Sequence, residues 1–136
     1  MKSLPSDMMM LALLVSTSTA FGQTTLGDLL VQGAKKVPIA EIQTKLTGMK
    51  VDSTSPAGFP MRLSFEPGGV VYSVVEVPSG ARQFSGKWYV PEDGKVCTLF
   101  AANPESCAFY FSTEKAAFAT RSESNKETPI RKMWDR

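Results

Sequence analysis

The side chains best suited to chemistry are the thiols of Cys97 and Cys107, ten positions apart. Their spacing differs from the Cys-x-x-Cys of redox proteins, and the sequence contains no histidine to complete a zinc site with them. In an exported protein, two cysteines are expected to form one structural disulfide bond. Closing a loop of this size is expected to stabilise the fold by roughly 2.5–3 kcal/mol.

The sequence contains no histidine, which also excludes the enzyme classes that depend on this residue. Ser-His and Cys-His triads and the common zinc, copper and non-haem iron sites use imidazole, which is also the usual general base. Carboxylate pairs serve glycosidases, but Glu66, Glu92 and Asp93 occupy expected turns. The Ser-x-x-Lys pattern at Ser112-Thr113-Glu114-Lys115 lies between two expected strands, whereas penicillin-recognising enzymes place it at a helix start. We therefore predict a non-enzymatic protein with no catalytic residues, metal or cofactor.

Aromatic side chains form the other notable group. Alternation along the strands places Trp88, Phe109 and Phe111 in the interior, and Tyr89 and Tyr110 on the opposite face. An outward aromatic ring with a polar tip suits a recognition surface. The candidate binding face therefore comprises Lys87, Tyr89 and Tyr110, with the adjoining loop from Phe100 to Ser106.

The elements that would position these residues follow an export signal. Lys2 precedes an unbroken apolar run from Met8 to Val15, and small residues come next. That order is typical of a signal peptide, and the run is too short to span a bilayer. The favoured signal peptide is residues 1–22, with cleavage after Ala20 as the alternative. A mature chain starting at Gln23 is expected to be periplasmic or secreted.

The chain from Gln23 onward has the length of one domain. Basic and acidic residues balance over residues 23–120, and the excess of positive charge lies in residues 121–136. Nucleic-acid binding needs clustered cations, so nucleic acid is excluded as a partner. No later segment is apolar enough to form a transmembrane segment. We expect one β-rich domain with N-terminal helices over residues 23–120 and a basic C-terminal tail over residues 121–136.

Hydrophobic spacing predicts the fold of this domain. Helical spacing predicts one or two short helices, around Leu26–Leu30 and between Pro38 and Gly48. Alternating residues then predict six strands, at about 61–65, 70–77, 83–90, 95–100, 107–112 and 115–120, or seven with 49–53. Pro91-Glu92-Asp93-Gly94 has the residues of a type I turn followed by a left-handed residue. Such a series predicts an antiparallel meander that curls into a small half-open or closed β-barrel, with a helical N-terminal cap; a two-sheet sandwich is the alternative.

The tail carries a local helix signal. Thr128 can cap a short helix with Pro129 at its first position, which places Ile130, Met133 and Trp134 on one face. We expect this face to dock on the domain or on a partner, and a frayed terminus is the alternative.

Several fold-making residues resemble those of a known group. They are Leu46-Thr47-Gly48, the Gly-x-Trp at Gly86 to Trp88, the Asp93-Gly94-x-x-Cys97 turn and strand, and the aromatic strand that opens at Cys107. From Thr25 to about Thr120, this pattern resembles small exported proteobacterial proteins of uncharacterised function. The resemblance implies a lipocalin-like or small-barrel architecture and a periplasmic or secreted setting, and it transfers no mechanism.

Two functional classes remain open. The first is a small binding module of the cell envelope, which takes a small apolar ligand in the barrel mouth or an envelope protein on its face. The alternative is an inhibitor of a secreted or periplasmic hydrolase that presents a rigid segment, such as Thr98 to Ser106 or Asp52 to Pro60. A ligand carrier requires an unfilled cavity, whereas an inhibitor requires an ordered segment that protrudes.

Overall fold

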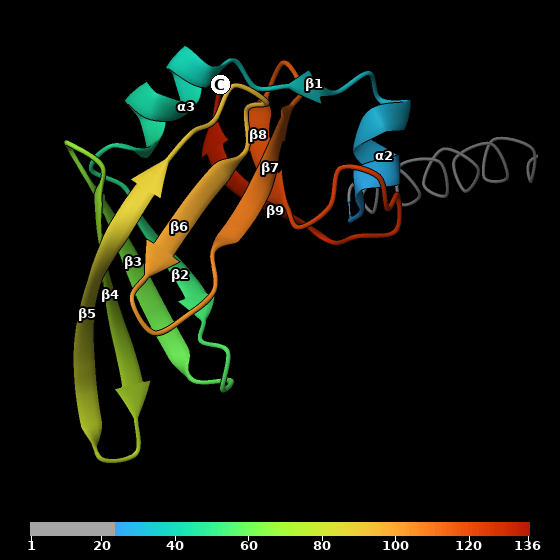
Figure 1. Ribbon diagram of the computed structural model, residues 1–136. Helices are drawn as coiled ribbons and strands as arrows, with labels where there is room; N and C mark the ends of the chain where they lie inside the picture. The colour runs from blue at the N-terminus through green and yellow to red at the C-terminus, as the bar shows by residue number, and fades with distance from the viewer. Residues whose placement is uncertain (1–23) are drawn as a thin grey trace, which may run out of the picture.

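The computed structural model of the protein describes residues 24–136. The expected signal peptide, residues 1–22, and the expected mature start at Gln23 lie outside this range. Within it, short helices precede a long run of strands (Figure 1). In chain order, the elements are α2 Leu26–Val31, β1 Lys35–Lys36, α3 Ile39–Leu46, β2 Lys50–Thr54, β3 Pro60–Glu66, β4 Val70–Val77, β5 Gly80–Tyr89, β6 Val96–Phe100, β7 Ser106–Ser112, β8 Ala116–Thr120 and β9 Ile130–Asp135.

Strands β2 to β9 form an antiparallel meander in which each strand pairs with the next one in the chain. The short strand β1 pairs separately with β7. The sheet curls into a half-barrel with β2 and β9 as its edges (Figure 1). The predicted mainly-β meander with a helical N-terminal region is therefore confirmed, in its half-open form.

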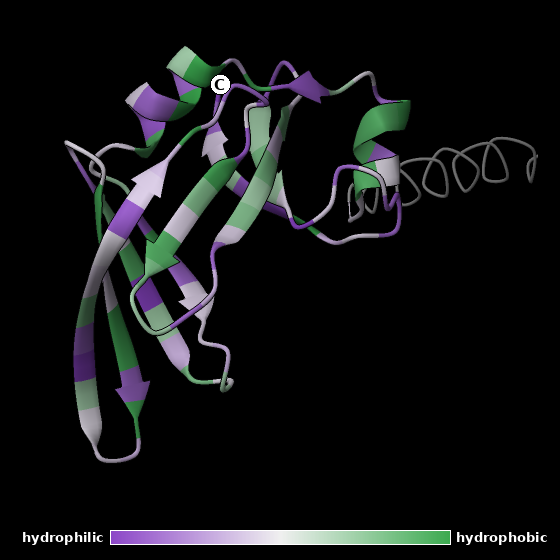
Figure 2. Cartoon of the chain, in the orientation of Figure 1, coloured by the Kyte–Doolittle hydropathy of each residue, from purple (hydrophilic) through white to green (hydrophobic). Residues whose placement is uncertain are grey.

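The β4–β5 hairpin shows how alternation builds this sheet. Val71, Ser73 and Val75 of β4 are buried, while Tyr72 and Val74 between them are exposed, because successive side chains point to opposite faces. Strand β4 is hydrophobic along most of its length (Figure 2). The hairpin projects well past the neighbouring strands (Figure 1).

At Gly86 and Gly94 the backbone geometry requires glycine. Gly94 adopts φ 83° and donates its N–H to the carbonyl of Pro91 at 2.9 Å, which confirms the predicted turn between β5 and β6. Gly86 faces β6 so closely that an added Cβ would lie 2.5 Å from the carbonyl oxygen of Leu99 and 2.7 Å from a ring carbon of Phe100. The glycine of the Gly-x-Trp pattern therefore lets β5 and β6 pack without a clash.

Buried residues form two clusters on opposite faces of the curled sheet. Inside the half-barrel, Ile42 and Leu46 of α3 pack on a core that includes Trp88, and α3 covers one end of the sheet (Figure 1). On the outer face of β7 and β8, Leu26 and Leu29 of α2 pack on aromatic side chains of those strands. Strands β7 and β8 are therefore covered on both faces. In the described part of the chain, no helix is long and apolar enough to cross a membrane.

The C-terminal segment differs from the expectation. Residues Ile130–Asp135 form strand β9, which pairs with β8, so the helix predicted to start at Thr128 is wrong. The open edge of β8 offers backbone hydrogen bonds, and Trp134 gains a buried place in the core. These tertiary contacts outweigh the local capping signal. The docking expected of this segment occurs through a strand, within the same sheet as the preceding elements.

A register shift in this last pair sets which side chains of β9 face inward. Trp134 pairs with Ala117, and Arg131 pairs with Ala119, with the irregularity between Ala117 and Phe118. In a regular strand, an odd and an even residue would point to opposite faces. The extra residue lets Trp134 and Arg131 both lie on the concave side.

Candidate functional site

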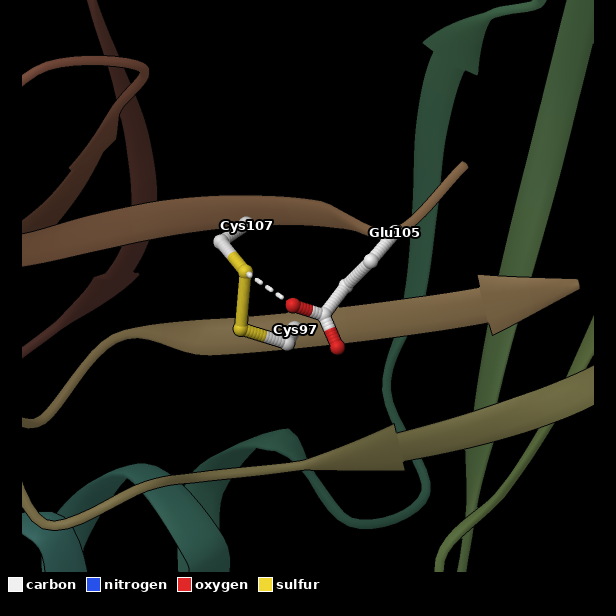
Figure 3. A group of neighbouring side chains, drawn as sticks. All are labelled: Cys97, Glu105 and Cys107. Carbon is white, nitrogen blue, oxygen red and sulfur yellow. Dashed lines mark hydrogen bonds between the residues drawn. A yellow bond between two sulfur atoms is a disulfide. The ribbon is translucent and has the colours of Figure 1, made fainter. Parts of the chain in front are cut away.

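The predicted disulfide is confirmed. Cys97 of β6 and Cys107 of β7 are directly paired across the two strands, with their Cα atoms 4.1 Å apart (Figure 3). A carboxylate oxygen of Glu105 lies 3.7 Å from the sulfur of Cys107 (Figure 3). The three side chains resemble a metal-binding cluster, but neither sulfur in a disulfide is a thiolate that could act as a ligand. This group is therefore structural.

The expected binding face is not assembled as one surface. Lys87 and Tyr89 lie exposed on the outer face of β5, and Tyr89 is 40% exposed. Tyr110 is only 5% exposed and belongs to the core inside the half-barrel. The prediction that Tyr110 points outward beside Tyr89 is therefore wrong.

The register from β5 to β7 explains this error. Trp88 pairs with Thr98, and Thr98 pairs with Ser106, so Tyr110 shares the inner face with Trp88. Trp88 is buried in the interior as predicted. Phe111 is buried instead beneath α2 on the outer face, where Phe109 packs beside it, so their assignment to the interior is wrong.

The expected disulfide could have predicted that Phe109 and Phe111 share a face with Cys97. Side chains of directly opposed residues in an antiparallel pair lie on the same face. Cys107 therefore shares a face with Cys97, and Phe109 and Phe111, at two and four positions further on, follow it. Aromatic character alone did not separate the two faces, because both faces of β7 are covered.

A cavity of about 300 Å³ lies on the concave side of the sheet, between β2–β3 and β6–β9. Ala108 and Ala119 line it, where larger side chains would fill the interior. The hollow therefore exists because small residues stand on the inner face away from the end that α3 covers. Its apolar wall is completed by Val51, Leu63, Phe65, Val96 and Met133.

One row of residues crosses the wall of this hollow. Tyr110 on β7 pairs with Ala119 on β8, and Ala119 pairs with Arg131 on β9. All three residues line the cavity. Because neighbouring strands are about 4.8 Å apart, the backbones at Tyr110 and Arg131 are about 10 Å apart, with only a methyl group between their side chains.

The hydroxyl group of Tyr110 in this row has no hydrogen-bond partner among residues 24–136. The ring of Tyr110 stacks on Trp134 with centroids 5.8 Å apart. Burial raises the pKa of Tyr110, and the positive charge of Arg131 offsets part of that rise. The hydroxyl therefore stays protonated at neutral pH and can donate a hydrogen bond.

Two arginines give the hollow a positive rim. Arg121 and Arg131 both line it, and neither forms an ion pair within 4.0 Å in the described part of the chain. Asp52 lies on the facing edge strand β2, where a hydrogen bond from Arg62 at 2.9 Å is the main cause of its lowered pKa. Arg131 lowers the pKa of Asp52 only weakly by comparison. Asp52 is thus already matched by Arg62.

A second, broader depression of about 790 Å³ lies along β1 and the β7–β8 turn. Of its four cations, Lys36 and Arg136 are held in ion pairs, with Glu123 at 2.7 Å and Glu41 at 2.8 Å, while Lys35 and Lys115 form no ion pair within 4.0 Å in the described part of the chain. Its buried hydroxyl, on Ser112, accepts a hydrogen bond from Arg136 at 2.9 Å. This depression is lined mainly by polar and charged residues, whereas the hollow of the half-barrel has an apolar wall, so the hollow is the candidate site.

Sequence reasoning missed three residues of this site, namely Ala119, Arg121 and Arg131. Arg131 was assigned to a helix, and only its pairing with β8 brings it to the concave side. The three alanines of β8, Ala116, Ala117 and Ala119, were the available sign of an unfilled interior. No protein-family model, curated protein or solved structure matches this chain.

Proposed function

We propose that this protein is a non-enzymatic binding module of the cell envelope that takes a small apolar ligand into the hollow of its half-barrel. The observation that carries the proposal is the cavity of about 300 Å³ on the concave side of the sheet. That volume is at the lower end of the range for ligand pockets, so it suits a small molecule. Barrels of about eight strands have interiors of the size that holds one such ligand.

The composition of the wall supports an apolar ligand. Leu63 and Phe65 line the hollow from β3, and Met133 lines it from β9. Ligand pockets are mostly apolar, with a few polar groups that fix orientation. The half-open form, with β2 and β9 as separate edges, leaves the hollow accessible from one side.

Export to the periplasm or beyond is part of the proposal. The bond between Cys97 and Cys107 fits an oxidising compartment, and the sequence begins with the pattern of a signal peptide. The intact mass of the protein from an envelope fraction tests this point. We expect a chain that starts at Gln23, or at Phe21 as the alternative, and retention of Met1 would contradict export.

A titration with 1-octanol tests the ligand site. Tryptophan fluorescence should report binding, because Trp134 stacks on Tyr110 at the cavity wall. The variant Ala119→Leu places a larger side chain in the hollow, and we expect it to weaken octanol binding at least tenfold. The matched control is Ala81→Leu, which makes the same change at an exposed position of β5. Equal binding by A119L and wild type would show that the hollow is not the site.

A second candidate function, inhibition of a secreted hydrolase, is favoured by the β4–β5 hairpin. This hairpin projects from the body of the molecule (Figure 1), and its strands are paired as far as Val77 and Gly80 beside the turn. Such an ordered element loses little entropy on binding. Tyr72 and Val74 on its outer face would make the contact, since both are exposed. Assays with secreted proteases and glycosidases test it, and Y72S/V74S should abolish any inhibition found.

A further inference from the structure

We infer that the ligand of the half-barrel is an amphipathic anion, whose carboxylate is held by Arg131 and Tyr110 while its apolar chain occupies the hollow. This inference rests on the proposed function and adds the chemistry of the ligand's head group. It is carried by the row of Tyr110, Ala119 and Arg131 across β7, β8 and β9.

The position of Arg131 suits an ion pair with a ligand, since no acidic residue in the described part of the chain pairs with it. The register shift in β9 brings it to the concave side, and it lines the cavity without an ion pair within 4.0 Å among residues 24–136. A guanidinium group binds a carboxylate through two parallel hydrogen bonds, which is a strong and directional interaction. Arg121 lines the same hollow and adds a second positive charge.

Tyr110 provides the second contact. A buried tyrosine hydroxyl normally finds a hydrogen-bond partner, yet this one has none in the described part of the chain. The hydroxyl is also not sealed in the protein, since the one sealed and unpartnered side-chain oxygen there belongs to Ser73. It therefore meets the hollow as a free donor, and a carboxylate oxygen of a ligand would satisfy it.

The charges around the opening favour an anion over a cation or a neutral head group. Asp52 is the acidic group that Arg131 influences across the opening, and it is already paired with Arg62 at 2.9 Å. Arg121 and Arg131 therefore leave an excess of positive charge at the hollow. A cationic head group would be repelled, and a neutral one would gain only ordinary hydrogen bonds.

Three ligands with the same chain test this inference: octanoate, 1-octanol and octylammonium. We expect wild-type protein to bind octanoate about tenfold more tightly than octanol, and octylammonium most weakly. Raising the salt concentration should reduce the preference for octanoate, since exposed charges are screened. Calorimetry measures all three affinities directly.

Variants of the two residues identify the head-group site. Arg131→Gln should remove the preference, so that the ratio of octanoate affinity to octanol affinity falls from about ten to about one. Tyr110→Phe should reduce the preference several-fold without loss of stability, because the lost hydroxyl has no hydrogen-bond partner among residues 24–136. The matched control is Lys132→Gln, which removes a cation from the same strand at the position paired with Phe118, a residue of the outer cluster. This control should retain the full preference.

The outcomes separate the inference from the proposed function. Equal affinity of wild type for octanoate and octanol would overturn the inference and leave the apolar binding module intact. Retention of the octanoate preference by R131Q would also overturn it, because Arg131 would not hold the head group. If none of the three ligands bound to the wild-type protein, the result would contradict the proposed function itself.

Discussion

The indole nitrogen of Trp134 donates a hydrogen bond to one carboxylate oxygen of Glu41 at 3.1 Å, across 93 residues of chain. The other oxygen of Glu41 accepts a hydrogen bond from Arg136 at 2.8 Å. One side chain of α3 thereby holds two residues of the C-terminal segment, and the C-terminus lies beside α3 (Figure 1). Since Trp134 also stacks on Tyr110, the same contact supports the wall of the hollow.

Replacement of Glu41 should therefore destabilise the fold. In Glu41→Ala, the buried Trp134 loses its hydrogen-bond acceptor and Arg136 loses its ion pair. We expect the free energy of unfolding to fall by about 1–3 kcal/mol, measured by urea denaturation. The control Glu114→Ala removes an exposed glutamate in the β7–β8 turn and should cost less than about 0.5 kcal/mol. Equal losses in the two variants would contradict the role of Glu41.

Removal of the disulfide should weaken the protein without changing its fold. The bond joins residues ten positions apart, and the double variant Cys97→Ala with Cys107→Ala frees the unfolded chain. We expect a loss of about 2–4 kcal/mol in urea denaturation, with the β-sheet circular dichroism retained. Thiols that react fully in the native oxidised protein would contradict the bond itself.

Trp88 should be the most costly aromatic side chain to truncate on β5. Its ring packs edge-on against Phe65 with centroids 5.5 Å apart, and its indole N–H donates to the carbonyl of Glu66 at 2.9 Å. We expect Trp88→Ala to cost about 3–5 kcal/mol in thermal or urea unfolding. Tyr89→Ala, at the exposed neighbouring position, should cost far less. A Trp88 variant as stable as wild type would contradict its place in the core.

The start of α2 should make stability depend on pH. Asp28 has a lowered pKa, because its carboxylate accepts hydrogen bonds from the backbone and side chains of Thr24 and Thr25. A group with a lowered pKa stabilises the fold above its unfolded value, here 3.8, and that stabilisation is lost as the pH falls through its folded value. Wild type should therefore exceed Asp28→Asn in stability at pH 7. The difference in stability between wild type and Asp28→Asn should disappear at acidic pH. A difference that does not change with pH would show that the charged carboxylate of Asp28 does not stabilise the fold.

Much of this fold follows from local sequence patterns. Alternation in segments such as Val70–Val77 reports a strand with one buried face, and Pro91 to Gly94 reports its turn, because both depend on the geometry of a few adjacent residues. The helix between Pro38 and Gly48 was predictable on the same grounds, and the bond between Cys97 and Cys107 followed from the presence of just two cysteines in an expected exported chain. Strands that follow one another in the chain usually pair, so the meander was also predictable, while a closed barrel and a two-sheet sandwich remained alternatives to the half-barrel.

The candidate site depended on contacts between distant segments. Whether Tyr110 or Phe111 faces inward is set by the register of β7 against β6, and a shift of one residue exchanges the two faces. Both side chains are buried, because α2 covers the outer face, so hydrophobicity could not distinguish them.

The conformation of the C-terminal segment also depended on contacts with distant residues. The sequence determined a local capping signal at Thr128 and Pro129, and it determined the residues that β9 uses. Only the tertiary structure decided that Ile130–Asp135 would pair with β8, because the free edge of that strand and the pocket for Trp134 exist only after the sheet has formed. That pairing creates the hollow and places Arg131 on its wall, where this arginine has no ion pair within the part of the chain that the structure describes. The hollow requires side chains from β2, β3, β7, β8 and β9 to be brought to one place, which no local pattern encodes.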